Sequence, residues 1–508
     1  MVEKSGFVMF LVQNNVISQP NDLPAATTLA RSALNTVYDE TLGKVKELLQ
    51  QAPQTVGVTT DMWTDNYKKR SYMAVTVHFC SSDFRMHSVV LRTAVFSEAH
   101  TGYNIQAELE NTCDQFGLQD KKLVYITDQG SNVVKACKLM GVERYGCVAH
   151  ALHNLITVDG VSKCPELQAL IVKVKNIVKT FTYKINLLES EAAKMADEQV
   201  KAELEKILST IEDEEQYSTC ETEDADNEEA GNLTSENRSS SSGLRPQSVS
   251  LKKDCPTRWN CLLLMLESVI KNQELIERCL SRLRLFEHML NDEEWKTLEN
   301  LVQFLKIFLS ATEILSGATY PTVSLVLLFR TEIAGRLAES SDDCDIVRSI
   351  KQRMRAALDK RLPVTELHAI AAIMDPSQRN LITLQDYLTQ RGTTTVDLLT
   401  EAIQKYVGVT DSSTTSSEFE NQEVVDSASS RQWKRAKLEL LSKHAGSAPS
   451  RAQEIQQFRC LSVSPDDVMT WWESQQNTYP NISKLARALL AIPATSVSSK
   501  NRPLRDRK

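Results

Sequence analysis

The sequence predicts a mixed α/β domain followed by a block of helices. Three runs between residues 55 and 96 carry β-branched and aromatic side chains in alternation, as strands with a buried face do. A helical pattern, a fourth apolar run and more helical sequence follow, which indicates strands and helices in one domain. Beyond residue 255, apolar residues recur at the spacing of buried helix faces. A chain of 508 residues needs more than one hydrophobic core.

The elements of the α/β domain begin with a helix predicted over residues 24–50, where apolar residues recur every three or four positions. The runs "TVGVTTDMWT", "RSYMAVTVHFC" and "MHSVVLRTAVF" predict three strands with short polar turns, a pattern typical of an antiparallel meander. A helix near residues 104–116 and a strand at "KLVYITD" come next, and further helical sequence completes the domain.

The rest of the chain alternates between helical and polar sequence. Residues 165–211 predict helix, and residues 212–250, acidic and then serine-rich, predict disorder. We therefore predict six segments: a helical lead-in (1–54), the first part of the α/β core (55–182), a charged helix with a disordered linker (183–252), a helical domain (253–408), a low-complexity linker (409–450) and a C-terminal segment (451–508).

The composition excludes some classes of protein and leaves others open. The formal charge of −8 does not argue against nucleic-acid binding, because much of the acid lies in one stretch, "EDEEQYSTCETEDADNEE". No run of about 18 apolar residues is present, so we expect no membrane span. The 11 cysteines are scattered without a paired framework, which favours a reducing compartment, the cytosol or the nucleus.

Two aspartates follow apolar strand sequence and are candidate ligands for a metal ion. Asp61 lies in "VGVTTDMWTDNY" and Asp128 in "LVYITDQGSNVV". A carboxylate at the end of a buried strand needs water, a donor or a cation. Two of them on neighbouring strands can share Mg²⁺ and so support phosphoryl transfer. The alternative interpretation is that each aspartate caps the turn or helix that follows it.

Two further motifs carry residue types that can bind a metal ion or a nucleic acid. In "YGCVAHALHNLI", Cys147 and His150 have C-x-x-H spacing, which zinc sites use, but no second pair completes a ligand set. A packed, hydrogen-bonded role near the acidic strand ends is therefore preferred. In "DCPTRWN", Arg258 can hold a phosphate and Trp259 can stack on an unpaired base. The alternative is that the tryptophan anchors the first helical turn to the core.

Taken together, five stretches resemble the hAT superfamily (hobo/Activator) transposases and the BED zinc-finger proteins descended from them. These stretches are, in order, "TTDMWTDNY", "ITDQGSNVV", "CVAHALHN", "CPTRWN" and "WWESQQNTYPNISKLARALLAIPATS". The resemblance covers roughly residues 2–499. It implies an RNase H-like core, interrupted by a large all-α insertion and completed by a C-terminal hAT dimerisation segment.

The resemblance also implies roles for individual residues. Asp61 and Asp128 match the first two of three metal-binding acids, and Cys147 and His150 match a motif near the active site. Trp259 matches an insertion-domain tryptophan that stacks against DNA, with Arg258 beside it. The C-terminal segment implies a homo-oligomer, with dimerisation residues Trp471, Trp472, Leu485 and Leu489. The implied partner is DNA, the compartment is the nucleus, and the cofactor of an active enzyme is Mg²⁺ or Mn²⁺.

Two departures from the family pattern bear on activity. No zinc finger precedes Asp61, so zinc is not expected in this chain, and Lys500 occupies the position of the third acid, with the sequence ending soon after. A lysine there removes an oxygen ligand and adds positive charge. We therefore expect a transposase-derived nuclear protein that binds DNA, dimerises and is catalytically inactive. The alternative is a fragment or splice form of an active cut-and-paste transposase, with Mg²⁺-dependent phosphoryl transfer and hairpin formation.

Overall fold

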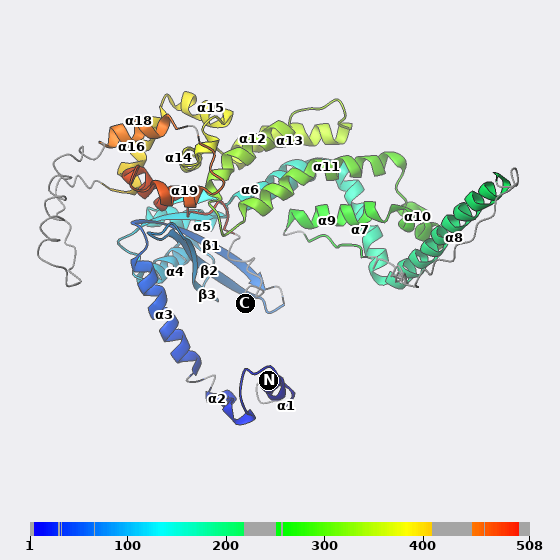
Figure 1. Ribbon diagram of the computed structural model, residues 1–508, viewed down its shortest axis with the longest axis horizontal. Helices are drawn as coiled ribbons and strands as arrows, with labels where there is room; N and C mark the ends of the chain where they lie inside the picture. The colour runs from blue at the N-terminus through cyan, green and yellow to red at the C-terminus, as the bar shows by residue number, and fades with distance from the viewer. Residues whose placement is uncertain are drawn as a thin grey trace, which may run out of the picture. The chain divides into compact units, whose positions relative to one another are not determined.

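The computed structural model describes residues 5–28, 31, 33–65, 67–217, 250–255, 258–408, 450–461 and 463–496 (Figure 1). The chain divides into two compact units. The first is formed by Met1–Leu152, Ser310–Gly335 and Asp359–Lys508, and the second by His153–Leu309 and Arg336–Leu358. Segments distant in the sequence thus build each unit. None of the described helices combines the length and the apolar character that crossing a membrane requires.

A five-stranded sheet forms the centre of the first unit, in the order β3-β2-β1-β4-β5. The strands are β1 (Thr55–Asp65), β2 (Arg70–Cys80), β3 (Met86–Val95), β4 (Lys122–Thr127) and β5 (Glu143–Gly146). The first three pair antiparallel, which confirms the predicted meander, and β4 and β5 join in parallel. The mixed α/β class is confirmed. The short strand β5 was not predicted, because "ERYG" has no apolar alternation.

Helices α4 (Gly102–Gln115) and α5 (Ser131–Met140) cover one face of this sheet. The C-terminal half of α3 (Leu34–Gln50), which precedes β1, packs on the same side, and two further helices, α1 (Ser5–Gln13) and α2 (Ala26–Thr28), come before it (Figure 1). Val58 and Val75 from the strands pack with Leu109 of α4 and Ala136 of α5 in one apolar cluster. The helix predicted over residues 24–50 forms mainly from Leu34 onward.

Helices from the C-terminal part of the chain cover the opposite face. The first unit also contains α14 (Glu366–Met374), α15 (Ile382–Arg391), α16 (Thr395–Tyr406), α18 (Arg451–Arg459), α19 (Val468–Gln475) and α20 (Pro480–Leu489), with most of α6 (Val148–Asn154) and α12 (Val326–Arg336). Val124 and Ile126 of β4 pack here with Leu485 and Leu489. A Cβ on Gly57 of β1 would lie 3.2 Å from the Ile492 Cα, so the glycine allows this close approach.

The second unit is mainly helical in its described part. It contains α7 (Pro165–Tyr183), α8 (Ile185–Tyr217), α9 (Trp259–Lys271) and α10 (Gln273–Leu283), with most of α11 (Asp292–Leu315) and α13 (Asp345–Arg361). Within the helical domain predicted over residues 253–408, most of the described residues from 258 onward form helices. This predicted block nevertheless contributes to both units, because residues 310–335 and 359–408 belong to the first.

The predicted disordered linker needs one correction. Residues 212–217 form the last turns of α8 instead of disordered sequence. Glutamate is a good helix former, and extending an existing helix costs far less than nucleating one. The rest of that linker up to residue 249, and the low-complexity linker from residue 409 to 449, lie outside the described residues.

Candidate metal centre

The two predicted aspartates lie at the same level of neighbouring parallel strands. The last paired residues of β1 and β4 are Thr59 and Ile126, and Asp61 and Asp128 each come two positions later. Both aspartates line one cavity of about 210 Å³. The structure therefore brings together the two carboxylates that the sequence placed on separate motifs.

The sequence predicted Asp61 at the end of a strand, but the residue lies within β1. The strand continues to Asp65, where it pairs with Arg70 of β2. The apolar half of β1 ends near Asp61 because only that half lies between two strands. The Asp61 side chain is largely buried, with 7% of the residue exposed. Carboxylates are seldom buried to this extent unless they are paired or bind a metal ion, so the burial of Asp61 on a central strand is consistent with a role as a ligand.

Asp128 combines a structural role with its position in the cavity. Its Oδ1 accepts a hydrogen bond of 2.9 Å from the backbone N–H of Gly130, which forms the turn into α5. The Arg144 guanidinium donates to the Asp128 backbone carbonyl at 3.1 Å and so fixes the segment that follows β4. One carboxylate oxygen of Asp128 therefore caps the turn, as the alternative interpretation predicted. The residue still lines the cavity.

The remaining walls of the cavity come from β1, from the start of α5 and from the segment around the start of α4. They are formed by Thr60, Met62, His100, Ile105, Gly130, Ser131, Asn132 and Val133. The first turn of α5 presents backbone N–H groups and the positive end of the helix dipole, which favour an anion. Sequence reasoning missed His100 and Arg144, because neither belongs to a motif with recognisable spacing.

Two carboxylates are a sufficient protein contribution for hydrated Mg²⁺, which commonly uses one or two plus water or phosphate oxygens. Within the described ranges, no group of three or more His, Cys, Asp or Glu side chains is placed to hold a metal ion. The residues present therefore fit a partly hydrated cation and not a fully protein-ligated one. Lys500, at the position expected for the third acid, lies outside the described residues.

Cys147 and His150 lie beside this pair and contact each other. Burial acts to raise the pKa of the Cys147 thiol, but the interactions with His150 and Ser496 lower it below the ordinary value. The hydrogen bond with Cys147 raises the pKa of His150 despite its burial, and the charges of Asp128 and Asp61 raise it further. A protonated His150 would thus face the acidic end of the sheet.

The C-terminal segment, although distant in the sequence, contacts the chain at Cys147 and Val148. The backbone N–H of Ser496 donates to the Cys147 Sγ at 3.2 Å, and the Val148 N–H donates to the Ala494 carbonyl at 3.0 Å. The Ala494 N–H in turn donates to the Thr322 Oγ1 at 2.9 Å. Ser496 and Thr322 escaped sequence reasoning, because no periodic pattern links residues so far apart.

Arg258 and Trp259 belong to the second unit, at the start of α9. The Trp259 ring is 4% exposed and packs edge-on against Phe308, with 6.5 Å between ring centroids. This packing agrees with the anchoring alternative, and base stacking would require the first turn of α9 to open. Arg258 is exposed. The DNA-binding roles of both residues stay predictions.

The residues assigned to dimerisation lie mainly in the core of their own chain. Trp472, Leu485 and Leu489 have no exposed surface, and the Trp472 Nε1 donates to the Met374 carbonyl at 2.9 Å. Trp471 alone of the four is partly exposed. In this structure the apolar stripe of α20 is used to cover the sheet, and its role in assembly stays a prediction.

Comparison with known proteins matches two segments of the first unit to described protein families. Residues 59–143 match the ZBED1 RNase-like domain, and residues 452–502 match the hAT family C-terminal dimerisation region. The resemblance to the hAT superfamily is confirmed. The first match contains Asp61 and Asp128, and the second contains α18, α19 and α20 with the segment that reaches Cys147.

Full-length comparisons give relatives in plants and in the fruit fly. The chain is 21% identical to the zinc finger BED domain-containing protein RICESLEEPER 1 of Oryza sativa subsp. japonica, over 90% of this chain and 62% of that protein. It is 22% identical to the transposable element Hobo transposase of Drosophila melanogaster, over 65% and 42% of the two chains. It is also 22% identical to the putative AC transposase of Zea mays, over 93% and 56%. The chain thus spans about half the length of these relatives.

Proposed function

We propose that this chain is a transposase-derived nuclear protein that binds DNA, forms a homo-oligomer and does not cleave DNA. The observations that carry the proposal are the pair of carboxylates, Asp61 and Asp128, on one cavity, and Lys500 at the position where the resemblance implies a third acid. The strand order and directions, with three antiparallel strands followed by two parallel ones, support an RNase H-like core.

Asp61 and Asp128 would hold one Mg²⁺ or Mn²⁺ through their carboxylate oxygens. A bound divalent cation supplies positive charge that stabilises a phosphate group of DNA. The chain's own residues support the same contact, because the first turn of α5 and His150 both favour negative charge near the carboxylates. We propose that these groups orient a DNA phosphate in the cavity.

We expect loss of DNA cleavage because of the residue at the position of the third metal-binding acid. Lys500 stands at the position where the resemblance implies the third acid, and a lysine supplies no oxygen ligand. Loss of an essential catalytic group commonly lowers a rate by several orders of magnitude. The match to the dimerisation region supports the homo-oligomer, and the relatives named as transposases support DNA as the partner and the nucleus as the compartment.

The first prediction concerns Mn²⁺ binding and the nicking of supercoiled plasmid. We expect Asp61→Asn and Asp128→Asn each to weaken Mn²⁺ binding about tenfold or more, measured from the electron paramagnetic resonance signal of free Mn²⁺, because each removes a charged ligand. Asp120→Asn, at an exposed aspartate before β4, is the matched control and should leave binding unchanged. Lys500→Glu should tighten Mn²⁺ binding.

The same proteins decide between the proposed function and its alternative. Asp61 and Asp128 are both intact, which favours an active cut-and-paste transposase as the second candidate. We expect no nicking in Mn²⁺ beyond that seen with Asp61→Asn. Nicking by the unmodified chain that disappears in Asp61→Asn, and not in Asp120→Asn, would establish the alternative.

A further inference from the structure

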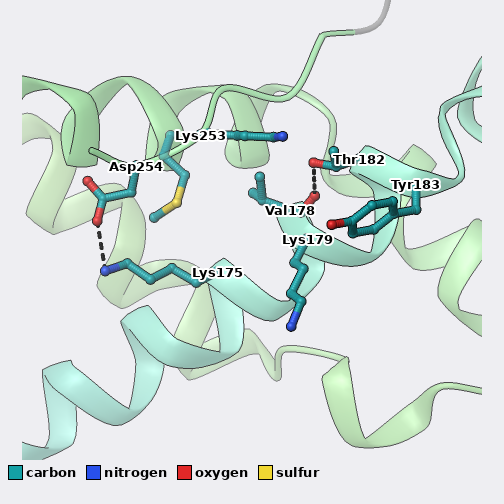
Figure 2. Close-up of a pocket in the computed structure, with 8 residues that line it drawn as sticks. Lys175, Val178, Lys179, Thr182, Tyr183, Lys253 and Asp254 are labelled. Atoms are coloured by element: carbon teal, nitrogen blue, oxygen red, sulfur yellow. Dashed lines mark hydrogen bonds and ion pairs between the residues drawn. The ribbon is translucent and has the colours of Figure 1, made fainter. Parts of the chain in front are cut away.

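The second unit contains a cavity of about 330 Å³ that no motif of the sequence had indicated. Its lining comes from α7, from the segment before α9 and, through Met265, from α9 itself (Figure 2). The lining residues are Lys175, Val178, Lys179, Thr182, Tyr183, Lys253, Asp254 and Met265. All of them lie within the second unit, and the cavity is distinct from the one at Asp61 and Asp128.

The cavity has an apolar floor and an aromatic side chain at its edge. Val178 and Met265 are buried, with 3% and 0% of each residue exposed. The Thr182 hydroxyl donates to the Val178 carbonyl at 2.8 Å, so it is directed into its own helix. Tyr183, at the end of α7, is 82% exposed. An exposed tyrosine beside an apolar floor offers a surface on which a planar group can stack.

Two ammonium groups at this cavity have no ion-pair partner within the described ranges of the chain. The Lys175 Nζ lies 2.7 Å from the Asp254 Oδ2, which leaves that lysine paired. Lys179 and Lys253 form no ion pair with any residue that the structure describes. They come from different segments, Lys179 from α7 and Lys253 from the residues before α9 (Figure 2). The cavity is therefore positive in a chain whose overall charge is negative.

The segment that carries Lys253 is fixed at two points. The backbone N–H of Lys252 donates to the Ser268 Oγ of α9 at 3.0 Å, and Asp254 pairs with Lys175 of α7. Lys253 lies between these two attachments. Its position opposite α7 is therefore set by the fold, which reduces the entropy lost when a ligand is bound.

We propose that this cavity binds one nucleotide of an unpaired DNA strand. The phosphate would lie between Lys179 and Lys253, and the base would stack on Tyr183 over the apolar floor. A positive groove combined with an aromatic platform is the general chemistry of single-strand binding. The inference rests on the proposed DNA-binding function and assigns it a second site.

The size and lining of the cavity favour this ligand over a duplex or a simple anion. Its volume is at the lower end of the range of about 300–1,000 Å³ seen for small-molecule sites, which suits one nucleotide and not a base pair. A phosphate alone would use the lysines and leave the tyrosine and the apolar floor without a partner. The base of a free nucleotide could also stack there, so the test includes one.

The test measures fluorescence anisotropy of a labelled oligothymidylate and of a duplex of equal length, using the full chain. The first variant is Lys179→Gln/Lys253→Gln, which removes two phosphate contacts. Its matched control, Lys271→Gln/Lys296→Gln, makes the same change of charge at exposed lysines of α9 and α11 that do not line the cavity. Tyr183→Ala removes the stacking surface, and Tyr183→Phe retains it.

We expect the first variant to weaken oligothymidylate binding and to lower the slope of log affinity against log salt by about 1.4, since each contact contributes about 0.7 for single strands. The control should retain the slope. Tyr183→Ala should weaken binding about tenfold, and Tyr183→Phe should bind as the unmodified chain does. Thermal unfolding monitored by circular dichroism establishes that each variant is folded.

Three outcomes would overturn the proposal. Equal losses in the lysine variant and its control would show a general charge effect. Unchanged oligothymidylate binding in Tyr183→Ala would remove the stacking site and leave DNA binding by the chain intact. Displacement of the strand by free thymidine monophosphate at comparable concentration would assign the cavity to a mononucleotide. Absence of binding to both oligothymidylate and duplex would instead contradict the proposed function itself.

Discussion

His368 of α14 is a titratable side chain held in the apolar interior of the first unit. The residue is 5% exposed, and burial lowers its pKa to about 4. A hydrogen bond involving the Pro363 backbone opposes this shift, while the nearby charge of Arg330 adds to it. The ring of Tyr145 lies 6.3 Å away, centroid to centroid. The histidine is therefore neutral in the folded chain at neutral pH.

The depressed pKa of His368 predicts a loss of stability in mild acid. The unfolded chain takes up the proton near pH 6.5 and the folded chain only near pH 4, so protonation favours the unfolded state between these values. The contribution is fully present above pH 6.5 and falls by about 1.4 kcal/mol per pH unit, to a loss of about 3 kcal/mol at pH 4. We expect the free energy of unfolding of His368→Gln to lack this pH-dependent loss.

Urea unfolding of both proteins at a series of pH values measures the effect. The informative quantity is the difference in free energy of unfolding between the two, because carboxylates elsewhere titrate in both. As the pH falls from 6.5 to 4, the free energy of unfolding of the variant should rise relative to that of the unmodified chain. A constant difference over this range would show that His368 does not titrate as its burial predicts.

Glu454 shows how one buried side chain joins two helices of the C-terminal region. The residue belongs to α18 and has no exposed surface. Its Oε1 accepts from the backbone N–H groups of Asn481 and Ile482 at 2.8 and 2.7 Å, and its Oε2 accepts from the Asn481 Nδ2 at 2.8 Å. A carboxylate at the first turn of α20 satisfies donors that the helix itself leaves open.

We expect Glu454→Ala to lower the free energy of unfolding by about 2–4 kcal/mol, since it leaves buried N–H groups without an acceptor. The exposed Glu473→Ala of α19 is the matched control and should change stability by less than about 0.5 kcal/mol. Urea unfolding measures both. Equal, small effects would show that the contact between α18 and α20 is not important for stability.

At the scale of elements, the sequence predicted those that have their own periodicity. β1, β2 and β3 run for ten or eleven residues rich in β-branched and aromatic side chains, and α4 has a buried apolar face, so local pattern was sufficient. β5 has four residues and forms only because β4 offers a parallel edge to it. An element that depends on its neighbour has no local signal, and for that reason it was missed.

At the scale of the whole molecule, the candidate site combines residues from three distant parts of the chain. Asp61 and Asp128 could be predicted as a pair, because both follow apolar strand sequence and parallel strands bring their ends together. The contact of Ser496 with Cys147 spans 349 positions and depends on how α20 packs on the sheet. The wide sequence separation and the absence of any pairing pattern put such a contact beyond prediction from residues alone.

The same packing bears on how the chain assembles with a second copy. The sequence assigned both tryptophans of "WWESQQ" to dimerisation, yet the structure separates their roles. Trp472 is fully buried and bonded to Met374, whereas the ring of Trp471, 4.8 Å from that of Trp472 between centroids, retains exposed surface. A side chain without exposed surface cannot contact a second copy, so of the two tryptophans only Trp471 is available for such a contact.

We therefore expect Trp472→Ala to lower the free energy of unfolding by about 3–5 kcal/mol through the cavity it leaves, without changing the mass of the folded protein. Trp471→Ala should cost less stability and shift the mass toward the monomer. Urea unfolding and light scattering at one fixed protein concentration separate the two effects, because the stability of an oligomer depends on concentration. A folded Trp472→Ala monomer of unchanged stability would place Trp472 at the interface. It would also show that α19 packs differently in the assembled protein.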